Sequence, residues 1–163
     1  MVADNFSTLK LTVMISQSMY FPWCGFLDQI RLSDIFVHYD DVQLTRGFYN
    51  RVQVKTDQGT IWISVPLLGK SQKQLIKESY ISYKEDWISK HRSLIINSYR
   101  KTKFIDDVIA LFDAVHKNKY ERLHELSRAS IIALSQYLKL NNKIKFLDSS
   151  SLVSSGRSSQ RLC

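Results

Sequence analysis

The 163-residue sequence has only two cysteines, two prolines and five glycines. Cys24 and Cys163 stand far apart and form no CxxC pair, so we expect reduced thiols and neither a disulfide framework nor a zinc site. No apolar run approaches the roughly 20 residues that cross a bilayer, which excludes an integral membrane protein. The N-terminus carries Asp4 and a short, interrupted apolar run, which does not resemble an export signal. We therefore expect a cytoplasmic protein.

The residues that are present are typical of a packed globular protein. Hydrophobic residues make up 44% of the chain and aromatic residues 12%, so we expect one domain over residues 1–163. The net charge of +8 permits a phosphorylated ligand or peripheral contact with an anionic membrane face. Because no block of like charge occurs, we do not expect a nucleic-acid partner.

The first forty residues outline a βαβ unit. Residues 9–15 form a short apolar run, a loop with Pro22 and Gly25 follows, and residues 25–33 have helical spacing. A second apolar run, residues 35–37, comes next. This order predicts two parallel strands joined by a helix.

The next region changes period twice. Two alternating runs, residues 50–56 and 60–67, flank a turn at residues 57–59 and predict a β-hairpin, while residues 75–81 offer one more short strand. From residue 83 onward three segments have helical periodicity, and residues 143–150 predict a last strand. The predicted class is therefore α/β: a parallel-sheet βαβ start, an inserted β-hairpin, a helical second half and a sheet that is incomplete at the C-terminus. The Ser-rich tail, residues 149–163, ends where a further helix would begin.

The loop after the first strand is unusually aromatic. In open α/β sheets, ligands bind beyond the carboxyl ends of the strands, and this loop occupies that position. Tyr20 and Trp23 can stack on a base or a sugar ring, and Ser16 and Gln17 can hydrogen-bond a polar ligand. The alternative is that Phe21 and Trp23 pack under the edge of the sheet as core residues.

A polar loop after the second strand should emerge at the same end of the sheet. Asp40 and Asp41 can serve acid–base chemistry or bind Mg²⁺, although adjacent strand residues point to opposite faces. His38 shares a face with Asp40, so the two are a candidate base and its orienting partner, and a buried core histidine is the alternative. No histidine cluster has metal-ligand spacing. The same loop supplies further candidate ligand-binding residues: Gln43, Arg46, Asn50 and Arg51.

The order of these motifs resembles the WbqC-like protein family. The family pattern has a Ser-Gln-Ser or His-Gln-Pro triplet, a Tyr-x-Pro-Trp-x-Gly stretch, an Asp-x-Phe-Val strand and an Asp-Asp-Val-Gln loop. An Asn-Arg pair, a Trp-containing strand ending in Val-Pro and a late Arg-Leu-x-x-x-Cys helix follow. In this chain the pattern falls on residues 16–18, 20–25, 34–37, 40–43, 50–51 and 62–66, and the late helix begins at residues 161–163. The triplet here is Ser-Gln-Ser, so no role of the family's histidine can be carried over.

The resemblance implies a setting in bacterial surface-polysaccharide biosynthesis, notably of O-antigen. We expect a transferase whose partner is a nucleotide-activated or lipid-linked sugar, and the sequence names no cofactor. A non-catalytic sugar-binding or assembly protein is the rival from another class. Because the family's late helix is only begun, an inactive truncated remnant is the third reading.

Overall fold

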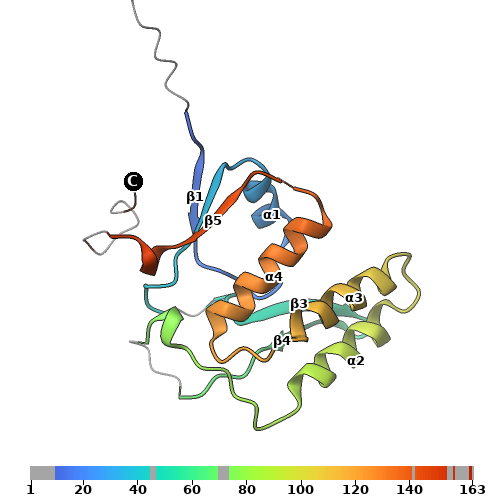
Figure 1. Ribbon diagram of the computed structural model, residues 1–163. Coiled ribbons are helices and arrows are strands. Elements are labelled where there is room, and N and C mark those ends of the chain that lie inside the picture. The colour runs from blue at the N-terminus through green and yellow to red at the C-terminus, as the bar shows by residue number, and fades with distance from the viewer. Residues whose placement is uncertain are drawn as a thin grey trace, which may run out of the picture.

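The computed structural model describes residues 10–44, 47–69, 74–140, 142–153, 156 and 162. Three parallel strands form a sheet in which β2 (Ile35–His38) lies between β1 (Val13–Ser16) and β5 (Lys145–Asp148) (Figure 1). The predicted βαβ start and the α/β class are confirmed. The last strand lies at an edge of this sheet, as the sequence indicates.

Two helices, α1 (Cys24–Arg31) and α4 (Leu123–Tyr137), pack against one face of the parallel sheet. Alternate residues of a strand share a face, and Met14, Phe36 and Phe146 occupy the same row across β1, β2 and β5. This row packs against buried side chains of the two helices: Phe26, Leu27, Ile30 and Ile131. Burying this row of large side chains stabilises the layer that positions the carboxyl ends of the strands.

The β-hairpin predicted from alternation is present. Its strands β3 (Arg51–Thr56) and β4 (Gly59–Ser64) are antiparallel, and Gly59 has the positive φ of 113° that the tight turn requires. The inward side chains of Val54 and Ile63 are buried. The hairpin contacts α2 (Trp87–Tyr99), and α3 (Ile105–His116) packs between α2 and α4.

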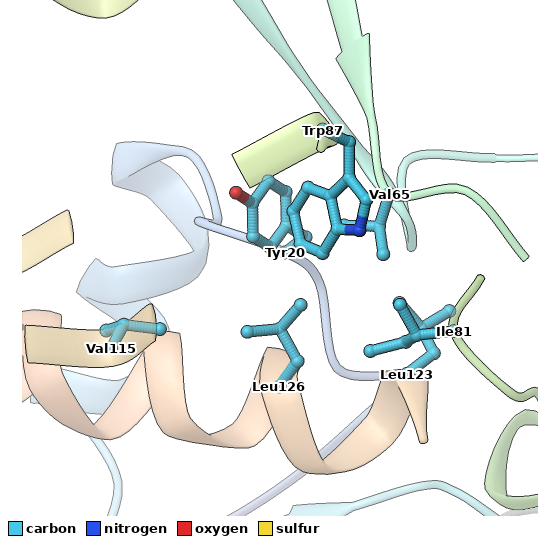
Figure 2. Packing of buried hydrophobic residues seen from close by; sticks show 7 residues of the cluster. All are labelled: Tyr20, Val65, Ile81, Trp87, Val115, Leu123 and Leu126. Atoms are coloured by element: carbon cyan, nitrogen blue, oxygen red, sulfur yellow. The ribbon is translucent and has the colours of Figure 1, made fainter. Parts of the chain in front are cut away.

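A second core joins the hairpin and the helices to the loop after β1. Tyr20 comes from that loop and lies beside Trp87, with 6.4 Å between ring centroids, and Leu123 and Leu126 of α4 lie opposite them (Figure 2). Both aromatic side chains are almost fully buried. Three further residues complete this cluster: Val65, Ile81 and Val115.

The sequence predicts one more short strand over residues 75–81. The structure instead has a short 3-10 helix in this segment, η1 (Ile76–Glu78), flanked by single backbone bridges. Ile76 is buried at 1% exposure, which anchors the segment without a ladder of strand pairs. The apolar residues of this segment do not alternate with polar ones, so the sequence lacks the two-residue period that indicates a strand. Within the part of the chain that the structure describes, no helix is both long enough and apolar enough to span a membrane.

Candidate functional site at the carboxyl end of the sheet

The three parallel strands end on polar residues that share one row. Ser16, His38 and Asp148 are the last residues of β1, β2 and β5, and the register pairs Ser16 with His38 and His38 with Asp148. Helix α4 begins at this same end of the sheet (Figure 1). This edge is where open α/β sheets place their ligands.

His38 is a buried, neutral imidazole at the centre of this row. Its side chain is 2% exposed, its Nδ1 lies 2.6 Å from Ser18 Oγ, and its ring stacks on Phe146 with 5.7 Å between centroids. The pKa of His38 is lowered to about 3, and the largest cause is burial, which disfavours the charged imidazolium. Electrostatic interactions with Arg128 and then with His124 act in the same direction. The ring therefore binds no proton near neutral pH and can act there only as a neutral hydrogen-bonding group.

The first turns of α4 face this row with polar side chains. Arg128 donates a hydrogen bond to Asp148 Oδ2, and the pair is partly buried. Burial lowers the pKa of His124, while the nearby carboxylates of Asp40, Glu125 and Asp148 act in the opposite direction. We refer to His38, His124, Ser127, Arg128 and Asp148 as the carboxyl-end cluster.

The carboxyl-end cluster contains most of the unpartnered buried polar atoms in the described part of the chain. Four of them belong to it, and the fifth is Trp87 Nε1. A buried polar atom without a hydrogen bond is costly, and its presence in a folded protein calls for a ligand, a water or a catalytic role. The four atoms are His38 Nε2, His124 Nδ1, Ser127 Oγ and Asp148 Oδ1.

Asp40 and Asp41 hold the segment that follows β5, the 3-10 helix η2 (Ser149–Ser151). Asp40 Oδ1 accepts a hydrogen bond from the Ser150 backbone N–H at 3.0 Å, and Asp40 Oδ2 accepts one from Ser150 Oγ at 2.7 Å. Ser149 Oγ lies 3.0 Å from Asp40 Oδ1 and 2.5 Å from Asp41 Oδ1. Asp40 thus bonds to the chain after β5, and His38 bonds to Ser18, so the expected His38–Asp40 pair is not formed.

Replacing Asp40 with alanine should lower the free energy of unfolding by about 2–4 kcal/mol, because donors on Ser149 and Ser150 lose a buried, charged acceptor. Urea unfolding measures this loss. Asp57→Ala, at the exposed hairpin turn, is the control and should change stability by less than about 0.5 kcal/mol. Equal stability of the two variants would contradict the structural role of Asp40.

The aromatic loop splits between core and surface. Tyr20 is fully buried, and its hydroxyl lies 3.2 Å from His116 Nε2 and 3.4 Å from His91 Nδ1. Trp23 is 61% exposed, and its ring covers Gly25 so closely that an added Cβ would lie 2.0 Å from it. Ser16 and Gln17 are half-buried beside the cluster's edge of the sheet. The loop therefore brings Ser16, Gln17 and Ser18 near the site, while Tyr20 belongs to the second core.

Asn50 and Arg51 support the hairpin and its neighbours. Asn50 Nδ2 donates to the Val65 carbonyl at 2.9 Å. Arg51 Nε donates to the Gly47 carbonyl at 3.1 Å, and its guanidinium lies 4.6 Å from the ring centroid of Trp62. Gln43 is exposed and forms a backbone bridge with Leu75. Arg46 lies outside the described residues.

Sequence reasoning missed the contribution of α4 and β5 to this site. His124 and Arg128 are four positions apart and so share a face of α4, and Asp148 ends β5 as His38 ends β2. The predicted last strand was the sequence feature that could have indicated this contribution, because Asp148 lies at its end. In the described part of the chain, no group of three or more His, Cys, Asp or Glu residues is arranged to hold a metal ion.

Comparisons with known proteins agree with the resemblance found in the sequence. The model of the WbqC-like protein family matches residues 17–163. The uncharacterized protein Rv1507c of Mycobacterium tuberculosis is 35% identical over 135 residues, which cover 81% of this chain and 58% of that relative. The chain thus spans somewhat more than half the length of the relative it matches. No solved structure gives a significant match.

Proposed function

The chain belongs to the WbqC-like protein family, and we propose on that premise that it acts in O-antigen or related surface-polysaccharide biosynthesis as a transferase of an activated sugar. The family name supports the polysaccharide setting. The observation that carries the site is the group of four unpartnered buried atoms in the carboxyl-end cluster. A nucleotide-activated or lipid-linked sugar is the proposed substrate.

The chemistry of the carboxyl-end cluster suits a polyhydroxylated ring. Each sugar hydroxyl both donates and accepts, and the cluster offers an acceptor in Asp148 Oδ1, a hydroxyl in Ser127 and two imidazole nitrogens. Arg128 supplies donors only, and its remaining N–H groups suit a phosphate or a ring hydroxyl. Binding such a ligand would satisfy the atoms that the protein leaves without partners.

Within this proposal, His124 accepts the proton of the attacking hydroxyl as that oxygen bonds to the anomeric carbon of the sugar. The bond from this carbon to the phosphate oxygen breaks, and the phosphate of the nucleotide or lipid carrier leaves with the bonding electron pair. A general base must be neutral at the working pH, and burial lowers the pKa of His124 below its usual value. The neighbouring carboxylates of Asp40 and Asp148 stabilise the imidazolium that results. His38, whose pKa is about 3, is a much weaker base and serves as a hydrogen-bonding group.

A non-catalytic sugar-binding protein is the second candidate. The observation that favours it is the bonding of Asp40, the buried carboxylate at this end of the sheet, to Ser149 and Ser150. Such a protein would use the same carboxyl-end cluster to bind a sugar and would need no proton acceptor.

The binding part of the proposal is tested with Asp148→Asn. A panel of nucleoside-diphosphate sugars is titrated into the protein, and at least one should raise the thermal midpoint of the wild type. Asp148→Asn should weaken that binding at least ~10-fold, because it removes the charged acceptor that fixes Arg128. Asp28→Asn, which breaks the exposed ion pair with Arg31, is the matched control and should bind as the wild type does. Equal affinity in all three proteins would contradict the assignment of the site.

His124→Gln separates the enzyme from the binding protein. In a strain that lacks its own family member, an enzyme should lose polysaccharide formation by ~10²-fold or more while it keeps its affinity for the sugar. A binding protein with this variant should complement the strain as well as the wild type does. The second result would remove the catalytic role of His124 and leave the binding role in place.

A further inference from the structure

A cavity of about 210 Å³ lies between the hairpin and helices α2, α3 and α4. Its walls are largely aliphatic and aromatic. They include Val52, Val54 and Ile63 from the hairpin, Leu111 and Phe112 from α3, and Leu134 from α4. No residue of the carboxyl-end cluster lines this cavity, so a ligand bound here would be independent of the proposed function.

One wall is built by a residue in an unfavourable backbone conformation. Phe21 has φ of 46°, in the left-handed region that non-glycine residues seldom adopt. Its N–H donates to Ser130 Oγ at 3.1 Å, and its ring stacks on Phe112 with 5.8 Å between centroids and 13° between planes. Such strain persists where surrounding contacts impose it, and it concentrates at binding sites. Here it places an aromatic ring in the wall of the cavity.

The mouth of the cavity is polar on one side. Tyr137 donates its hydroxyl to Asp107 Oδ2 at 2.8 Å, and both residues line the opening. Val108 is 45% exposed and Tyr137 is 49% exposed, so the cavity is reached from solvent beside the Asp107 carboxylate. The interior is therefore apolar and the mouth carries a negative charge.

We propose that this cavity binds the hydrocarbon chain of an amphipathic molecule whose polar head is uncharged or cationic. Because the walls are almost entirely apolar, packing a hydrocarbon chain against them removes apolar surface from water, which favours binding. The Tyr137–Asp107 pair can hydrogen-bond a hydroxyl or ammonium head at the mouth. The Asp107 carboxylate repels a carboxylate or phosphate head at the same position.

The head-group preference is tested with three eight-carbon probes of matched chain length. In isothermal titration calorimetry, 1-octanol and octylammonium should bind the wild type at least ~10-fold more tightly than octanoate. Asp107→Asn should raise the affinity for octanoate several-fold and reduce this difference. Asp106→Asn removes an exposed carboxylate that does not line the cavity and should leave the difference unchanged. Equal affinity for the three probes would overturn the head-group assignment.

The cavity itself is tested by filling it. Leu111→Phe adds volume to the wall and should weaken 1-octanol binding at least ~10-fold, whereas Leu138→Phe, at an exposed position outside the cavity, should not. Val108→Phe adds volume at the exposed mouth of the cavity and is the second filling variant. Because Val108 is exposed, this substitution should leave the packing of the core unchanged. The absence of saturable 1-octanol binding to the wild type, or binding that both filling variants retain, would overturn the proposal.

Discussion

Acidification from pH 7 to pH 4.5 is expected to lower the stability of this protein by several kcal/mol. All four histidines of the chain have pKa values below the usual one, because burial disfavours the charged imidazolium. The pKa of His38 is about 3 and that of His91 is about 4. Below pH 6.5 the unfolded chain therefore binds protons that the folded protein does not bind.

The sign of this effect follows from proton linkage. Stability rises with pH wherever the unfolded state holds more protons, so the contribution of each histidine is complete above pH 6.5 and is lost as the pH falls. For His38 the loss at pH 4.5 is about 2–3 kcal/mol, since one pKa unit corresponds to ~1.4 kcal/mol. His91, His116 and His124 add to it in the same direction.

Thermal unfolding at half-unit steps between pH 7.5 and pH 4 measures this dependence. His91→Gln is the comparison variant: it removes one titrating group beside Tyr20 and should flatten the curve between pH 6.5 and pH 4. A midpoint that stays constant down to pH 4.5 would show that the histidines are not buried as neutral groups.

Replacing Tyr20 with alanine is expected to cost about 3–5 kcal/mol of unfolding free energy, while Trp23→Ala should cost less than about 0.5 kcal/mol. Tyr20 is fully buried against Trp87, His91 and His116, and its removal leaves a large cavity in the second core. Trp23 is 61% exposed in the same loop. Urea unfolding of the two variants gives both values.

The Tyr20→Ala and Trp23→Ala variants also test whether these side chains of the aromatic loop contribute to core packing or to ligand binding. If Tyr20→Ala folded with wild-type stability and lost only ligand affinity, the residue would be a ligand-stacking group rather than a core residue. A loss of ligand affinity in Trp23→Ala without a change in stability would place a ligand on the exposed face of the loop. The two outcomes are independent, because Tyr20 points into the second core and Trp23 points to solvent.

Local patterns predicted the elements whose formation depends on near neighbours in the chain. The alternation of Val52 and Val54 with polar residues, and Gly59 in the turn, were enough to predict the hairpin. The apolar runs that became β1 and β2 were also recognised, because short buried strands are continuous in their hydrophobicity. Residues 75–81 had no such period, and tertiary bridges decided their conformation.

Residue types alone could not separate the two aromatic side chains of the loop or predict the candidate site on α4. Tyr20 and Trp23 are three residues apart in one loop, yet only one enters the core. His124, Ser127 and Arg128 look like the polar face of an ordinary helix until α4 is placed against the ends of β2 and β5. The electrostatic interactions of His124 and Arg128 with His38 join segments more than eighty residues apart in the chain.

Local periodicity and ordered motifs are enough to assign the class of the fold, its elements other than residues 75–81, and the family to which the chain belongs. Tertiary structure alone decided which polar groups are buried without partners. It also decided that Asp40 bonds to Ser149 and Ser150 and that a cavity lies under the hairpin. The physical reason is that desolvation and hydrogen-bond satisfaction depend on every segment that packs around a group, and most of those segments are distant in sequence.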